Sequence, residues 1–275
     1  MPAMHAFPPV CISVGCSAAV GSAGIQADLK TFTALSCYGA AALTSVAAQT
    51  FAGIAEIEPI PERLLRAQLD AVAEALPIAA VKIALCANAG QIRIIARWLA
   101  GLRRVPVVVD PVVADARGIP LQQPETIKAM AEELLPRATI TTPNRFEAAM
   151  LSGMEECLSV EDMEQAARTL CRRHGCPVVV TGGGLTGESL DVLCGIDGVR
   201  HYSCPTNPKG KVSGIGCAHA AALTAGLAKG DSLREALMQA KLYVSAGIAA
   251  APALPSGRHV LWHGVTVREQ TIIER

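Results

Sequence analysis

The sequence lacks a surplus of charge of either sign. Lys and Arg together number 24, Asp and Glu together also number 24, and charged residues make up only 17% of the chain. Neither a basic stripe nor a charged tail is present, so the composition argues against nucleic acid as a partner. If the protein recognises phosphate groups, local geometry must provide the site.

The sequence also lacks a basic segment before its first apolar run, because the first Lys or Arg is Lys30. We therefore expect no secretory signal peptide. The uncharged stretch between Lys30 and Glu56 is long enough to span a bilayer. It is rich in Ala, Ser, Thr and Gly, however, and is interrupted by Gly39 and Gln49. A helix followed by a buried strand explains it better than a membrane span.

No CxxC pair or regular spacing occurs among the ten cysteines. A chain of 275 residues can bury a sizeable core without disulfide bonds. We expect reduced thiols and a cytoplasmic protein.

Apolar strand patterns and amphipathic helix patterns alternate along almost the whole chain. Strands are expected at about 10–14, 40–48, 79–85, 107–109, 139–142, 177–181, 189–195 and 199–203. Helices are expected at about 25–35, 61–75, 89–102, 124–135, 160–173, 217–228 and 232–250. This pattern predicts an α/β fold with a mostly parallel central sheet and helices on both faces. No linker or repeat divides it, so residues 1–275 form one expected domain with its core at about 10–265.

The Gly214-Ile215-Gly216-Cys217 turn directly precedes an apolar helix. Glycines let consecutive N–H groups converge, and the start of a helix carries partial positive charge, so the turn suits an anion. The same field is expected to lower the pKa of the Cys217 thiol. Taken alone, these residues are more often a glycine-rich turn with a buried cysteine than a catalytic site.

Other candidate residues follow strands, where ligands bind in parallel α/β sheets. Asp110 ends a strand of valines and has the carboxylate chemistry to hold Mg²⁺, although it is also a common strand terminator. Asn144 and Glu147 have the spacing of a capping box, which also aims Glu147 at the edge of the sheet. Gln49 is the polar end of an apolar strand, and its carboxamide can pair with an aminopyrimidine edge.

Weaker signals come from two glycine-rich segments. The small-residue loop at 21–28 opens a helix without a Gly-x-Gly-x-x-Gly pattern. That pattern does occur at Gly182, Gly184 and Gly187, but a strand is expected after it, so its usual structural context is absent.

Taken in order, several segments resemble those of a known family. They are 23–32 (AGIQADLKTF), 48–50 (AQT), 68–69 (QL), 110–112 (DPV), 142–144 (TPN) followed by 147–148 (EA), and 214–217 (GIGC). The chain resembles the hydroxymethylpyrimidine and phosphomethylpyrimidine kinases of thiamine biosynthesis, within the ribokinase-like superfamily. The resemblance runs from about Val10 to 257–263. The Gly-x-Gly-Cys turn is shared with cysteine-type pyridoxal kinases, whereas 23–32 with the downstream Ala-Gln is specific to the pyrimidine branch.

The resemblance implies a ribokinase-like fold and a kinase that phosphorylates 4-amino-5-hydroxymethyl-2-methylpyrimidine and then its monophosphate, using ATP and Mg²⁺. It implies that Gln49 pairs with the pyrimidine and that the pocket is shaped by Ala23, Asp28 and Val112. It also implies that Cys217 accepts the proton of the attacking group. The remaining implied roles are a γ-phosphate site at the amides of Gly214, Ile215, Gly216 and Cys217, a Mg²⁺ site at Asp110 and Glu147, and nucleotide contacts at Asn144, Thr181 and Gly183.

Two departures from the family pattern fall on the nucleotide side. Thr181 stands where the family has Lys, and Ile215 stands where it has Thr. Lys209 and Lys211 are candidates to replace the missing cation. Two alternatives therefore stay open: a kinase of pyridoxal or pyridoxine, and a divergent paralogue that binds the pyrimidine without efficient turnover. Ribokinase-like proteins commonly dimerise, so we expect a homodimer that acts on a small molecule.

Overall fold

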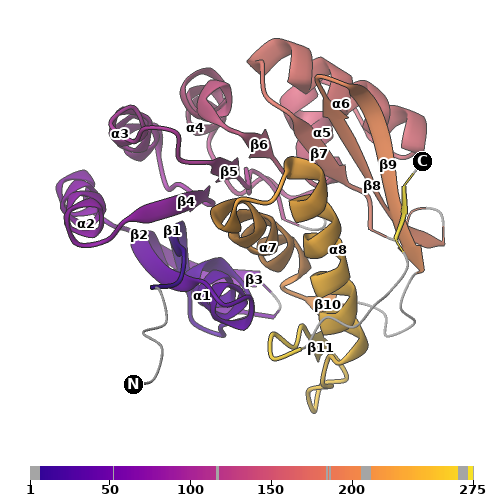
Figure 1. Ribbon diagram of the computed structural model, residues 1–275, viewed down its shortest axis with the longest axis horizontal. Coiled ribbons are helices and arrows are strands. Elements are labelled where there is room, and N and C mark those ends of the chain that lie inside the picture. Colours follow the sequence, from indigo (N-terminus) through magenta and orange to yellow (C-terminus); the bar gives the residue numbers. More distant parts are fainter. Residues whose placement is uncertain are drawn as a thin grey trace, which may run out of the picture.

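A large sheet crosses the molecule in the computed structural model, which describes residues 7–51, 53–115, 118–183, 185, 187–205, 212–265 and 272–274 (Figure 1). Its order is β12 (Ile273–Glu274), β9 (Gly198–Pro205), β8 (Glu188–Gly195), β7 (Val178–Thr181), β6 (Ile140–Thr141), β5 (Val107–Val109), β4 (Ile78–Ile83), β1 (Val10–Ala18), β2 (Tyr38–Thr50) and β3 (Gly53–Pro59). Strands β2, β1, β4, β5, β6 and β7 run parallel, and antiparallel strands flank them on both sides. The sheet is mostly parallel, as predicted.

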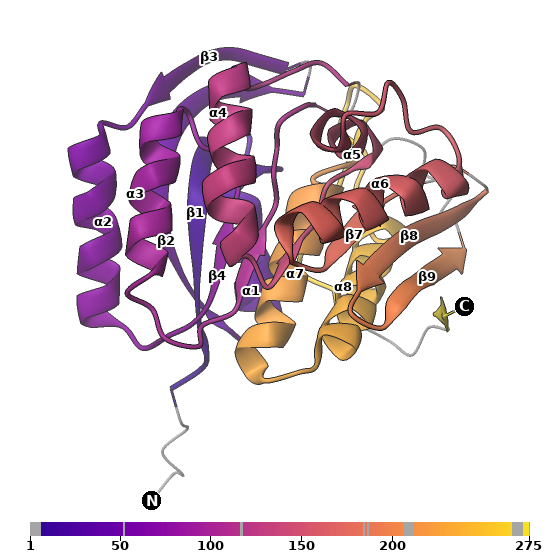
Figure 2. The same cartoon turned by 90° about the horizontal axis from the view of Figure 1, so that it is seen from above.

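Helices cover both faces of this sheet (Figure 2). One face carries α2 (Glu62–Ala75), α3 (Ala89–Leu99), α4 (Pro124–Ala129), α5 (Arg145–Ser152) and α6 (Val160–His174). The other carries α1 (Gly24–Ala34), α7 (Ile215–Lys229) and α8 (Leu233–Ala249). Helix α4 continues as a π-helical turn, η1 (Met130–Leu134), and a 3-10 turn, η2 (Leu135–Arg137).

The short strand β5 shows how the sequence builds the two layers. Val107 and Val109 pack into the core on the α2–α6 side, whereas Val108 packs against α7 and α8. Successive side chains of a strand point to opposite faces, so a strand buried on both faces needs an unbroken apolar run. Full burial of each valine contributes on the order of 1.5–3 kcal/mol.

The edge strand β3 was missed by the sequence reading. It pairs antiparallel with β2, and most of its residues are exposed, including Glu56 and Glu58. A solvent-exposed edge strand needs no apolar run, and charged side chains at an edge discourage pairing with other chains. A small separate pair, β10 (Val212–Ser213) with β11 (His259–Val260), was also not predicted.

The carboxyl ends of the parallel strands and the start of α7 lie at one side of the sheet. There Asp110 directly follows β5, and the amide of Asp110 bonds the carbonyl of Ile83 at the end of β4. This is the side where parallel α/β sheets bind ligands.

Among the described residues, no helix combines the length and apolar character needed to cross a bilayer.

Candidate active site

The start of α7 is shaped by a glycine that no other residue could replace. Gly214 caps the helix with φ +96°, and a Cβ at this position would collide with the carbonyl oxygen of Ser22. The loop before α1 therefore packs directly on the turn before α7. Ile215 is the first residue of the helix and Cys217 the third, so the turn presents its free amides as the sequence predicted.

Cys217 lies beside the loop that opens α1. The backbone amide of Gly24 lies close enough to the Cys217 sulfur to lower the pKa of the thiol, which places Ala23, the residue that caps α1, near the candidate catalytic thiol. Burial, helped by the charges of Asp110 and Asp28, raises the pKa of Cys217 to about 12, although Lys82 opposes this shift. The predicted lowering of this pKa is wrong, because desolvation and two nearby carboxylates outweigh the helix start. Cys217 is a neutral thiol in the free protein at neutral pH.

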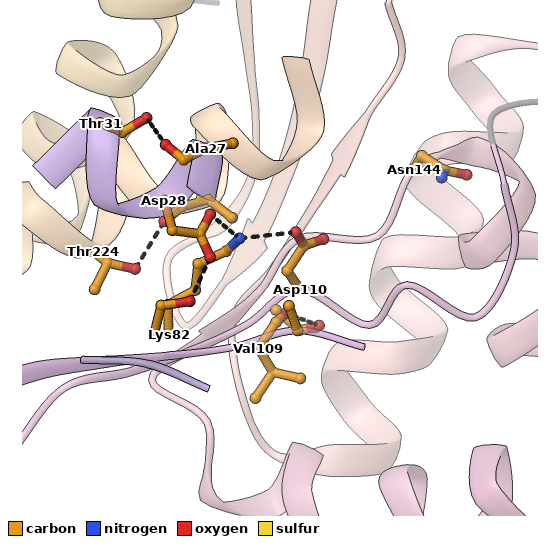
Figure 3. A network of polar contacts seen from close by, with 12 residues as sticks. Ala27, Asp28, Thr31, Lys82, Val109, Asp110, Asn144 and Thr224 are labelled. Atoms are coloured by element: carbon orange, nitrogen blue, oxygen red, sulfur yellow. Dashed lines mark hydrogen bonds and ion pairs between the residues drawn. The ribbon is translucent and has the colours of Figure 1, made fainter. Parts of the chain in front are cut away.

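A buried ion network stands next to this thiol (Figure 3). Lys82 Nζ donates a 2.6 Å hydrogen bond to Asp28 Oδ1 and lies 3.4 Å from Asp110 Oδ2. Ser13 Oγ donates a 2.6 Å bond to the other oxygen of Asp28. Burial alone would lower the pKa of Lys82, but Asp28, Cys217 and Asp110 together raise it. Lys82 is therefore a fixed positive charge between the two carboxylates.

Asp28 has no exposed surface, and both of its oxygens are bonded. In this structure it acts on the site by orienting Lys82 rather than by touching a ligand. Lys82 and Ser13 were missed by sequence reasoning. The available signal was a lysine in the middle of the apolar strand predicted at 79–85, since a charge in a buried strand needs a partner.

Asp110 and Glu147 form a second electrostatic feature. The predicted capping box is confirmed: Asn144 N donates to Glu147 Oε2 at 2.8 Å, and Glu147 N donates to Asn144 Oδ1 at 3.0 Å. Burial and the charge of Asp110 raise the pKa of Glu147 to about 8, although backbone amides oppose this shift. Two carboxylates close enough to repel form a donor set that suits a hard divalent cation. Among the described residues, no group of three or more His, Cys, Asp or Glu side chains could hold a metal.

The segment after Asp110 is strained. Val112 has φ +42°, which a β-branched residue rarely adopts. The Gln122 side chain holds this turn by donating to the carbonyls of Pro111 and Val112 at 3.3 and 3.1 Å. Val112 packs against a small buried cluster that includes Ala47 of β2.

Gln49 lies two residues beyond Ala47 on β2 and is half-buried. No hydrogen bond of its carboxamide is found among the described residues, so both its donor and its acceptor are open to a ligand. The apolar cluster beside Val112 and the open carboxamide together suit a flat, polar-edged ring.

A cavity of about 430 Å³ lies on another side of α7. Its walls include Asn144, Thr181 and Gly183, the three predicted nucleotide contacts, together with Ile215 and Gly216. Thr181 and Asn144 are joined by a backbone bridge between β7 and the start of α5. Lys209, Lys211 and Gly184 lie outside the described residues. Gly187 directly precedes β8, so a strand follows that glycine-rich segment, as expected.

The first turn of α7 separates the cavity from the thiol. Successive helical residues are turned by about 100°, so Ile215, Gly216 and His219 share one side of the helix while Cys217 faces another. The first three line the cavity, whereas Cys217 lies beside Lys82. The free amides at this helix start thus stand between two places where ligands can bind.

The sequence profile of the family described as phosphomethylpyrimidine kinase matches residues 19–262. The chain belongs to the phosphomethylpyrimidine kinase family. The hydroxymethylpyrimidine/phosphomethylpyrimidine kinase of Rhizobium meliloti is 38% identical over 257 residues, which cover 90% of this chain and 94% of the relative. The family resemblance seen in the sequence is thereby confirmed, and so is the prediction of a phosphotransferase.

Solved structures show the same fold. An ADP complex of Bacillus subtilis pyridoxal kinase matches with a TM-score of 0.87 and 33% identity, covering 93% of this chain and 97% of that one. The phosphomethylpyrimidine kinase of Clostridium difficile matches with a TM-score of 0.76 and 31% identity, covering 86% and 97%. The predicted ribokinase-like fold is confirmed, and pyrimidine and pyridoxal kinases both share it.

Proposed function

We propose that this kinase transfers the γ-phosphoryl group of ATP to 4-amino-5-hydroxymethyl-2-methylpyrimidine and then to its monophosphate, in thiamine biosynthesis. The observation that carries the proposal is the position of the α7 turn. Its free amides lie between the Cys217 side and the cavity lined by Asn144, Thr181 and Gly183. A γ-phosphate at these amides would face an acceptor on one side and the rest of the nucleotide on the other.

On the acceptor side, Gln49 would bind the aminopyrimidine edge through two parallel hydrogen bonds. Val112 and Ala23 would form the apolar walls, and Asp28 would contribute through Lys82. On the nucleotide side, the Bacillus subtilis relative is an ADP complex, which supports ATP as the phosphoryl donor, and the cavity that contains Asn144, Thr181 and Gly183 is the proposed place for it. The names of the pyrimidine-kinase relatives support the choice of acceptor.

The chemistry of phosphoryl transfer depends mainly on alignment and on electrostatic stabilisation. The amides of Gly214 to Cys217 would hold the transferred group, and Lys82 would stabilise negative charge near the acceptor. Cys217 can accept a proton only after losing its own, and nearby Asp28 and Asp110 oppose that loss. Asp110 and Glu147 would hold Mg²⁺, which supplies positive charge that offsets these carboxylates and the phosphates.

The assembly and location inferred for the protein are a cytoplasmic homodimer. All ten cysteines are free, which suits a reducing compartment. Ile57 of the edge strand β3 and Val46 of its neighbour β2 are 39% and 48% exposed. Exposed apolar side chains at the edge of a sheet suit contact with a second copy. Sedimentation of the purified protein measures whether it is a monomer or a dimer.

Turnover with MgATP tests the proposal, with release of ADP followed for hydroxymethylpyrimidine, its monophosphate and pyridoxal as separate acceptors. We expect turnover with both pyrimidines. The pyridoxal alternative is favoured by the structural match to the Bacillus subtilis enzyme, and turnover with pyridoxal alone would establish it instead. Saturable pyrimidine binding without turnover would identify a binding paralogue.

A further inference from the structure

The wall of the α7 cavity carries a buried polar cluster that the steps above do not use. It consists of His219 on α7, Asp191 on β8 and Lys241 on α8, which all line the cavity. Their exposed fractions are only 5%, 5% and 4%. Lys241 Nζ donates a 2.8 Å bond to Asp191 Oδ2 and lies 3.4 Å from Ser189 Oγ. Two helices and one strand therefore bring polar side chains to one place.

His219 is the unsatisfied member of this cluster. Neither of its ring nitrogens has a hydrogen-bond partner among the described residues, and both are shielded from solvent. Asp191 Oδ2 lies 3.8 Å from Nε2, which is too far for a hydrogen bond. Buried polar groups in proteins are nearly always hydrogen-bonded. A buried, unpartnered imidazole at the wall of a cavity therefore points to a ligand in that cavity.

The charges around His219 indicate which part of a ligand it meets. Lys241 already neutralises Asp191, so this wall offers no free positive charge to a phosphate. Burial lowers the pKa of His219, with Lys241 lowering it further, while Asp191 and Asp110 raise it. A neutral imidazole has one donor and one acceptor, which suits a hydroxyl group or a base edge. The amides that suit phosphate lie one helical turn earlier, about 6 Å along α7.

We propose that His219 is a specificity-determining contact for the nucleoside part of the bound nucleotide, through hydrogen bonds to a sugar hydroxyl or to the edge of the base. This inference rests on the proposed assignment of the cavity to ATP. Asp191 and Lys241 act as positioning residues that form the polar wall beside the imidazole.

The test is titration of ADP into the full-length protein by calorimetry, with His219→Leu compared with the unchanged chain. Loss of one or two neutral hydrogen bonds weakens binding about five- to tenfold. The melting temperature of the free variant should not fall, because leucine removes two unsatisfied nitrogens. His219→Gln, which keeps a donor and an acceptor, should recover part of the affinity. The KM for ATP should rise in parallel, with the KM for the pyrimidine unchanged.

A matched control comes from His174 on α6, whose Nε2 is also buried and unpartnered but which does not line the cavity. His174→Leu should leave ADP affinity unchanged. Titrations of 2′-deoxyADP and GDP separate the two contacts. If His219 contacts the 2′-hydroxyl, His219→Leu should not weaken binding of 2′-deoxyADP. If His219 contacts the base, the variant should not weaken binding of GDP. Equal weakening of inorganic tripolyphosphate would overturn the inference in favour of the phosphates.

Binding of ADP is measured without an acceptor, so the two proposals fail separately. If the unchanged chain binds ADP but phosphorylates no pyrimidine, the proposed function fails and the role of His219 is still decided by its variants. If the chain phosphorylates the pyrimidine but His219→Leu binds ADP as tightly as before, only the inference about His219 is overturned. A chain that binds no ADP overturns both.

Discussion

Two buried lysine–aspartate pairs lie on the two sides of α7, and their surroundings differ. Lys82 and Asp28 are 2.6 Å apart with no exposed surface, and two more carboxylates, Asp110 and Glu147, stand nearby. Lys241 and Asp191 are 2.8 Å apart at the wall of the cavity, beside the neutral His219. The region of Lys82 has three carboxyl groups and one lysine, whereas the region of Lys241 has one of each. The first therefore suits a cation and charged chemistry, and the second suits neutral recognition.

The largest expected effect comes from breaking the first pair. Lys82→Met leaves Asp28 buried without its partner, which should lower the free energy of unfolding by about 3–5 kcal/mol. Lys241→Met should cost less, because Asp191 borders the cavity and water can reach it. Denaturant titrations of both variants measure the difference. Equal losses of free energy of unfolding would mean that Asp28 and Asp191 are shielded from water to the same extent.

Removing the thiol tests the chemistry on the same side. Cys217→Ala should lower kcat about 10²-fold or more, in the range for loss of a group that transfers a proton. The affinity for ADP should change little, since the cavity does not include Cys217. Cys176→Ala is the control, because Cys176 is also a free cysteine but is buried away from the cavity and from the proposed site. An unchanged rate in Cys217→Ala would remove it from the catalytic assignment.

The excess of acid predicts a pH-dependent response to Mg²⁺. The pKa of Glu147 is raised to about 8, from an ordinary value of 4.5. The native state therefore holds a proton that the unfolded state releases, and stability falls as pH rises from about 4.5 to 8, by up to about 1.4 kcal/mol per pH unit. Above pH 8 the ionised pair binds a cation best, so Mg²⁺ should raise Tm more at pH 9 than at pH 6.

Glu147→Gln is the control for this effect, since it removes the ionisable group and keeps its size. The variant should lose most of the dependence of the Mg²⁺ response on pH in thermal melts without nucleotide. If the response keeps the same pH profile in the variant, the carboxylate of Glu147 is not involved.

The smallest expected effect is on recognition of the ring. Gln49→Ala should raise the KM for hydroxymethylpyrimidine about tenfold or more, because it removes both proposed hydrogen bonds, each worth about 0.5–1.5 kcal/mol net. The KM for ATP and the free energy of unfolding should stay unchanged, because the carboxamide has no partner in the described part of the protein. A variant with an unchanged KM for the pyrimidine would place the ring elsewhere.

Local patterns predicted much of the fold. The valine run at 107–109 is β5 without any shift of its ends, and the capping box at Asn144 and Glu147 starts α5 as expected. Both depend on neighbouring residues alone. The strand β3 was missed because its exposed, charged residues carry no apolar pattern, and its position follows from pairing with β2. The positions of the candidate site residues came from the family resemblance and from strand ends, and their roles stay predictions.

Local patterns in the sequence indicate most of the helices and buried strands, the family and the glycine-rich start of α7, because periodicity, capping and turn chemistry are local. Which charges meet depends on how those elements pack in the folded chain. The buried network joins Lys82 of β4, Asp28 of α1 and Ser13 of β1. These side chains form their hydrogen bonds only when the three elements pack together. The pKa of the Cys217 thiol is likewise raised, against the local expectation, because the folded chain buries the thiol and brings to it carboxylates that are distant in the sequence. Electrostatic energy depends on distance and on exclusion of water, and both are properties of the folded chain.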